Sequence, residues 1–110
     1  MEANFNPVSD AAALEELFER SNTEPVLLFK HSNACPISAR AYRQMQEVKT
    51  PVSLLVVQDS RDASREVEQR TGIRHETPQA LVIRNGRAVW NASHFDITAD
   101  VVEQAVKENQ

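Results

Sequence analysis

The sequence predicts an α/β fold, with a central mixed sheet of four to five strands and helices on both faces of the sheet. Two observations lead to this class. Segments with helical spacing of apolar residues alternate with short apolar strands along most of the 110 residues, which favours parallel crossovers. Asn85-Gly86 then separates two strand-like runs, and this dipeptide is the strongest short signal for an antiparallel hairpin.

Two helices and two strands are expected in the first half of the chain. Ser9 or Asp10 caps a first helix, whose apolar face consists of Leu14, Leu17 and Phe18. A short buried strand follows at residues 26–29. The next helix starts after Cys35 and ends before Thr50-Pro51, and its apolar stripe consists of Ile37, Ala41, Met45 and Val48. Residues 52–57 form a strand that is almost wholly apolar, as expected of a parallel strand with both faces buried.

The second half contains a polar helix, a hairpin and a last helix. Residues 60–71 form the polar helix, which is anchored through Ala63 and Val67 and capped by Gly72. The hairpin strands, at residues 80–84 and 87–90, flank Asn85-Gly86, and Thr98 caps the last helix. The predicted order is therefore helix, strand, helix, strand, helix, strand, strand, helix, in a single domain that spans residues 1–110.

Composition narrows the function class. A chain of 110 residues with 41% hydrophobic residues can bury a core without metal or disulfide support. Its single cysteine cannot form an internal disulfide or a cysteine-rich zinc site, and the histidines lack metal-ligand spacing, so no metal is expected. A net charge of −4 argues against nucleic acid as a partner, and no apolar run predicts a signal peptide or contact with a membrane. We expect a cytoplasmic protein with proteins or small molecules as partners.

Cys35 is the most informative residue, because it stands between an apolar strand and the start of a helical pattern. Unpaired backbone N–H groups at a helix N-terminus stabilise a thiolate. Pro36 suits the first helical turn, and Ser38 occupies the place where a Cys-x-x-Cys motif carries its second sulfur. The segment therefore predicts a one-thiol version of a two-thiol redox site, in which the Ser38 hydroxyl donates a hydrogen bond to the thiolate.

Several basic residues accompany this thiol in the sequence. Lys30, His31 and Arg40 are local positive charges that could stabilise the thiolate or bind an anionic substrate. Arg74 and His75 precede a second proline segment and could flank the same groove. Each also has an ordinary interpretation, since such charges are most often solvated and a free cysteine is often a small buried hydrophobe.

The order of elements, Cys35 at a strand-to-helix switch and Thr77-Pro78 just before a strand resemble the thioredoxin-like superfamily. This resemblance implies that Pro78 is cis and packs beside the thiol, with the backbone of Thr77 along the cysteinyl part of the substrate. Most of the chain is also similar to the YtxJ-type monothiol bacilliredoxins, small cytosolic proteins of bacteria that make bacillithiol. The segments that carry this similarity are FKHS at 29–32, CPIS at 35–38, HETPQ at 75–79 and ASHFDIT at 92–98.

The narrower resemblance implies removal of bacillithiol from protein mixed disulfides, a reaction of the redox stress response. The Cys35 thiolate would attack the bacillithiol sulfur, release the protein thiol and carry bacillithiol until a second low-molecular-weight thiol regenerates it. Bacillithiol is then a co-substrate, no cofactor is tightly bound, and bacillithiolated proteins are the partners. Lys30, His31 and Arg40 could then bind the malate carboxylates of bacillithiol or stabilise the thiolate.

Two other functions remain open at the level of sequence. One is a monothiol glutaredoxin-like protein that uses glutathione or binds an iron–sulfur cluster. Such proteins carry glycine and phenylalanine where this chain has Pro36 and Ile37, and the rigid proline ring leaves less room for a cluster. The other is a non-catalytic thioredoxin-like adaptor in which Cys35 is incidental.

Overall fold

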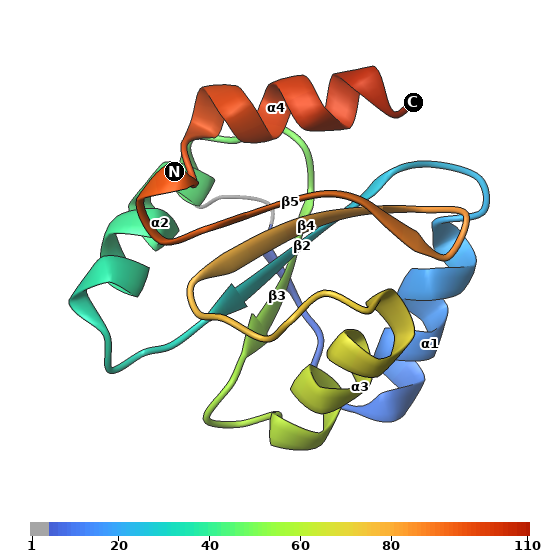
Figure 1. Cartoon of the computed structure of the whole chain (residues 1–110), viewed down its shortest axis with the longest axis horizontal. Coiled ribbons are helices and arrows are strands. Elements are labelled where there is room, and N and C mark those ends of the chain that lie inside the picture. Colours follow the sequence, from blue (N-terminus) through green and yellow to red (C-terminus); the bar gives the residue numbers. More distant parts are fainter. Residues whose placement is uncertain (1–4) are drawn as a thin grey trace.

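The protein, described here over residues 5–110 by a computed structural model, has a five-stranded mixed sheet between two layers of helices (Figure 1). In chain order the elements are β1 (Phe5–Pro7), α1 (Ala11–Arg20), β2 (Val26–His31), α2 (Pro36–Gln46), β3 (Val52–Val56), α3 (Arg61–Thr71), β4 (Gln79–Arg84), β5 (Arg87–Ser93), the 3₁₀ turn η1 (His94–Asp96) and α4 (Ala99–Glu108). Among residues 5–110, no helix combines the length and the apolar character needed to cross a membrane.

The sheet has the strand order β1-β3-β2-β4-β5. Strands β1, β3 and β2 are parallel, whereas β4 runs antiparallel to β2 and β5 antiparallel to β4. The predicted mixed sheet and the β4–β5 hairpin are therefore confirmed. Asn85 and Gly86 have φ angles of 55° and 76°, the left-handed conformations that a tight hairpin turn of this kind requires.

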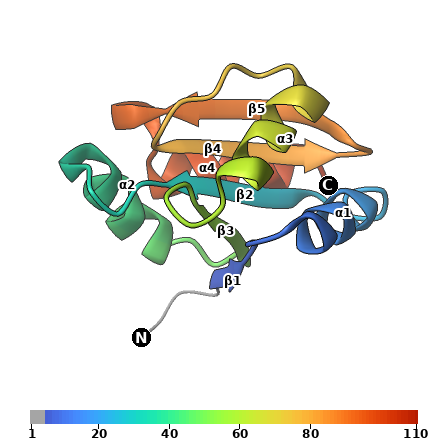
Figure 2. The same cartoon turned by 90° about the horizontal axis from the view of Figure 1, so that it is seen from below.

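Two hydrophobic cores lie on opposite faces of the sheet. One packs α1 and α3 against Leu28, Leu81 and their neighbours, and the other packs α2 and α4 against Leu27, Phe29 and Val82. Figure 2 looks onto one face of the sheet, with α1 and α3 in front of the strands and α4 behind them. Because successive side chains of a strand point to opposite faces, the apolar residues of β2 alternate between the two cores. The same alternation determines which polar residues of β2 lie on the α2 side of the sheet.

Most of the helix caps and apolar helix faces predicted from the sequence are present in the structure. The side chains of Asp10 and Thr98 accept N–H hydrogen bonds at the starts of α1 and α4, at 2.8 and 3.3 Å. Gly72 caps α3 in the left-handed conformation, with a φ of 72°. Ala41, Met45 and Val48 are buried as expected, but Ile37 is only half-buried because it stands at the first turn of α2.

Two elements were not predicted, and strands β2 and β5 continue beyond their predicted ends at residues 29 and 90. The three-residue strand β1 is too short to show a period, and η1 is a single turn between β5 and α4. Strand β2 continues to His31, beyond the predicted 26–29, because the polar residues Lys30 and His31 also belong to the sheet. Burying a lysine in a central strand is exceptional, and the apolar pattern alone could not indicate it.

Gly72→Ala is expected to lower the free energy of unfolding by about 1 kcal/mol, because a side chain is strained at this φ. No heavy atom lies within 4 Å of the added Cβ, so the loss reports backbone strain alone. Gly72→Asn is the control and should lose less, since asparagine tolerates the left-handed region better. Urea denaturation measures both variants; equal losses would contradict this explanation of the cap.

Candidate active site around Cys35

Three strand ends meet at one end of the sheet. Because β4 is antiparallel to both β2 and β5, the ends of β2 and β5 lie beside the start of β4. Gln79 lies opposite Lys30 on one side and opposite Ser93 on the other. The segments that continue from these ends lead to Cys35, to the Thr77-Pro78 dipeptide and to η1. They lie at the side of the molecule where α2 is drawn in Figure 1.

Cys35 is the residue immediately before α2, with extended backbone angles of φ −118° and ψ 122°. Its carbonyl accepts the N–H of Ala39 at 3.0 Å, the first hydrogen bond of the helix, and Pro36 occupies the first turn as predicted. The side chain is half-buried, and no side chain caps the helix at this end. The sulfur therefore stands at a helix N-terminus whose N–H groups are free to stabilise negative charge.

Gln58 fixes the loop that precedes Cys35. Its amide Nε2 donates to Ser32 Oγ at 2.8 Å, and its Oε1 accepts the N–H of Asn33 at 3.2 Å. Gln58 follows β3, which is parallel to β2, so the two loops leave the sheet at the same end. The sequence interpretation missed Ser32 and Gln58, although a polar residue just after each of two parallel strands is a signal that could have found them.

Ser38 is fully buried, and its hydroxyl has two partners. It accepts the N–H of Ser32 at 2.9 Å and lies 2.7 Å from His31 Nδ1. Burial lowers the pKa of His31, so its ring is neutral at pH 7. Its Nδ1 can then accept a hydrogen bond from the Ser38 hydroxyl. Within residues 5–110 no hydrogen bond joins Ser38 to Cys35. The structure thus differs from the predicted serine–thiolate bond: Ser38 points inward and holds the loop and His31.

Lys30 and His31 are neighbours in β2 and therefore point to opposite faces. His31 packs on Phe29 and Tyr42 on the α2 side, with ring centroids 5.6 and 4.8 Å apart. Lys30 is fully buried on the α3 side, where its Nζ donates to Gln79 Oε1 at 3.2 Å. The substrate contact predicted for Lys30 does not fit this placement, because strand alternation directs the amine away from the α2 side.

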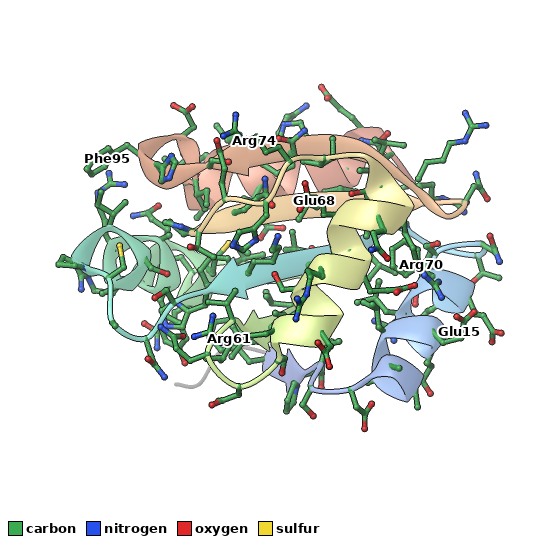
Figure 3. All side chains as sticks on the ribbon, turned by 60° about the horizontal axis from the view of Figure 1, so that its bottom comes forward. Glu15, Arg61, Glu68, Arg70, Arg74 and Phe95 are labelled. Atoms are coloured by element: carbon green, nitrogen blue, oxygen red, sulfur yellow. The ribbon has the colours of Figure 1, made fainter. Side chains whose placement is uncertain are left out.

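The segment before Pro78 is held from the α3 side of the sheet. Gln79 Nε2 donates to the carbonyl of Arg74 at 3.0 Å, so one amide links this segment to Lys30. His75 Nδ1 lies 3.2 Å from the hydroxyl of Ser64 on α3, and burial, together with the charge of Lys30, lowers the pKa of His75. Figure 3 shows Arg74 close to the α3 side of the molecule and Phe95 at the other end, near α2. Gln79 and Ser64 therefore hold the segment that contains Arg74 and His75 on the α3 side.

The Thr77–Pro78 peptide bond is cis, and Pro78 is buried beside the half-buried Thr77. The Pro78 carbonyl accepts the N–H of His94 at 3.0 Å, which ties this segment to η1. On α2, Arg40 lies with its guanidinium carbon 5.5 Å from the centroid of the Phe95 ring. The structure therefore brings His31, Arg40 and the Thr77-Pro78 segment to the same end of the sheet as Cys35.

Solved structures with the same architecture include redox proteins. A protein described as a candidate oxidoreductase with a thioredoxin fold is 35% identical, with a TM-score of 0.84 and 92% of each chain covered. Thioredoxins from Fasciola hepatica and Malassezia sympodialis both have TM-scores of 0.74, at 12% and 13% identity. The matches cover 96% and 99% of this chain and 99% and 92% of those chains, and at such low identity they show the fold alone. The fold and the Cys35 site define a thioredoxin-fold oxidoreductase.

The family is narrower than this class. The profile of the family "Monothiol bacilliredoxin BrxC" matches residues 6–102, nearly the whole chain. This chain belongs to the monothiol bacilliredoxin BrxC family, which confirms the resemblance drawn from the four sequence segments. A single cysteine at the start of α2 is consistent with the word monothiol.

Lys30 is expected to make the free energy of unfolding rise between pH 8 and 10.5. Burial lowers the pKa of Lys30 to about 8, with the charge of Glu68 opposing the shift, whereas an unperturbed lysine has a pKa of 10.5. The unfolded chain therefore binds more protons in this window, and stability increases as the buried charge is lost. At 1.36 kcal/mol per pKa unit, the gain is at most about 3 kcal/mol.

Lys30→Met isolates this contribution, because the variant has no proton to release. The difference in unfolding free energy between parent and variant, from urea titrations at pH 7.5 and pH 10.5, should grow in the parent's favour with pH. Lys107→Met replaces an exposed lysine and should show no such change. A difference that stays constant for Lys30→Met would mean that Lys30 titrates normally in the folded protein.

Ser38→Ala is expected to lower the free energy of unfolding by about 1–3 kcal/mol, because the Ser32 N–H and His31 Nδ1 lose a partner in a buried site. The freed loop should also slow alkylation of Cys35 by iodoacetamide. Ser64→Ala is a matched control, since it removes a buried serine that bonds His75 on the other face. It should cost stability and leave the alkylation rate unchanged. If alkylation of Cys35 slows equally in both variants, Ser38 has no specific effect on the thiol.

Proposed function

We propose that this protein removes bacillithiol from protein mixed disulfides by thiol–disulfide exchange at Cys35. The observation that carries the proposal is the position of the only cysteine, half-buried at the free N-terminus of α2 and at the sheet end that also presents Thr77 and Pro78. Membership of the monothiol bacilliredoxin family and the redox class of its structural neighbour support it. With one cysteine, the product of exchange must be an intermolecular mixed disulfide.

The proposed step exchanges one disulfide for another without net oxidation. The Cys35 thiolate attacks the bacillithiol sulfur, the bond between bacillithiol and the target protein breaks, and the target thiolate leaves and takes a proton from water. The N–H groups of α2 stabilise the attacking thiolate, and the bonds from Gln58 and Ser38 keep the preceding loop in place. The backbone of Thr77 lies along the cysteinyl part of the substrate.

The adduct on Cys35 requires a second thiol to complete the cycle. A low-molecular-weight thiol attacks it and regenerates the Cys35 thiolate, so bacillithiol enters as a co-substrate and no cofactor is tightly bound. This cycle suits the cytoplasm, where a pool of reduced small thiols is maintained. Bacillithiolated proteins are the proposed partners of the sheet end around Cys35.

Intact mass spectrometry with a bacillithiolated protein tests the proposal. The parent should yield reduced target and Cys35–bacillithiol adduct in equal amounts, and Cys35→Ser should yield neither. Ser38→Cys places a second sulfur one helical turn away, so it should accumulate an internal disulfide and release free bacillithiol. If the target is instead found linked to Cys35 while bacillithiol is released, the thiolate attacks the opposite sulfur. If the parent leaves the modification intact, the proposed function is wrong.

A further inference from the structure

Arg40 is a cation without an anionic partner at the thiol end of the molecule. Within residues 5–110 it forms no ion pair or hydrogen bond, and its Nη1 atom is buried with no partner at all. Its guanidinium makes a cation–π contact with Phe95, whose ring centroid lies 5.5 Å from the guanidinium carbon. Phe95 is itself 60% exposed, which is the largest exposure among the large hydrophobic residues of the described chain.

Helix stability does not explain this cation. Arg40 is the fifth residue of α2, close to the N-terminus, where the helix dipole disfavours positive charge. Side chains on a helix lean toward its N-terminus, so the guanidinium covers the turn that begins at Pro36 and follows Cys35. A long basic side chain that stands unpaired over the first turn of the helix that follows Cys35 is suited to a ligand rather than to the fold.

The position of Phe95 is fixed by the backbone around it. His94 has a φ of 56°, and its N–H donates to the Pro78 carbonyl at 3.0 Å. The turn η1 also packs against α2, so Phe95 stands between the helix of Cys35 and the Pro78 segment. In Figure 3 the ring projects at the α2 end of the molecule, away from the polar side chains around α3.

The ring contact leaves one edge of the guanidinium available. A ring that lies over a guanidinium contacts its face, whereas the N–H groups point outward in the plane. Nη1 is buried, but Nε and Nη2 are neither bonded nor buried, and they form the edge that binds a carboxylate with two parallel hydrogen bonds. The other two candidate cations do not compete: Lys30 points to the α3 side, and His31 is held neutral against Ser38.

We propose that Arg40, whose guanidinium group is oriented by the ring of Phe95, binds a carboxylate of the small thiol that is transferred to Cys35. The inference rests on the proposed exchange reaction and adds a selectivity to it. Thiols that carry a carboxylate, such as bacillithiol with its malate group, are transferred faster than neutral thiols. Arg40 is the ligand-binding residue, and Phe95 is a positioning residue that acts through it.

The test uses one reporter peptide that carries either mercaptosuccinate or 2-mercaptoethanol in a mixed disulfide, and it measures the rate at which the peptide thiol is released. The parent should react with the mercaptosuccinate form about tenfold faster, as expected of a charge-assisted bidentate contact. Arg40→Gln should bring the ratio of the two rates to about one. Phe95→Ala should give an intermediate ratio, and added salt should lower the ratio of the parent.

Arg43→Gln is the matched control, because Arg43 is an exposed arginine on the same helix and should not affect the ratio. A second arm keeps 2-mercaptoethanol as the small thiol and places Asp or Asn next to the modified cysteine of the peptide. If the effect of Arg40→Gln follows the peptide charge and not the small thiol, the proposal is overturned. It is also overturned if parent and Arg40→Gln show the same ratio while Cys35 adducts form. Absence of any Cys35 adduct would instead contradict the proposed function.

Discussion

The antiparallel register between β2 and β4 is the constraint on which the rest of the site depends. Because Lys30 lies opposite Gln79, the end of β2 and the start of β4 coincide, and β5 ends at the same place through the pairing of Gln79 with Ser93. The loop to Cys35, the Pro78 segment and η1 therefore leave the sheet together. A slip of one residue would invert the faces of β2 and would turn Lys30 toward α2.

Strand alternation also separates two polar groups that the sequence places side by side. On the α2 side, the half-buried His31 bonds the buried Ser38, and Arg40 supplies a cation whose Nη1 atom has no partner. On the α3 side, Lys30 and Gln79 anchor the segment that leads to Pro78. In the proposed reaction the first group would serve the exchange at Cys35, whereas the hydrogen bonds of the second hold the segment before Pro78.

Much of this arrangement could be predicted from the residues, because local signals and the global fold agree. The apolar stripes, Asn85-Gly86 and the position of Cys35 before Pro36 each have a short-range physical cause. The roles of Ser38 and Lys30 could not be obtained in this way, since they depend on which side of a strand or helix faces a neighbour. The pair of Arg40 and Phe95 joins residues more than fifty positions apart, and only the tertiary structure brings them into contact.

The central claim of the proposed function is that Cys35, at the N-terminus of α2, is the group that attacks the mixed disulfide. The most direct measurement compares the rate of Cys35 alkylation by iodoacetamide at pH 6 in the folded protein and in the urea-unfolded chain. The unfolded chain has no helix to stabilise the anion, so the folded protein should react several-fold faster even though the sulfur is half-buried. A folded protein that reacts at the same rate or more slowly would contradict the account.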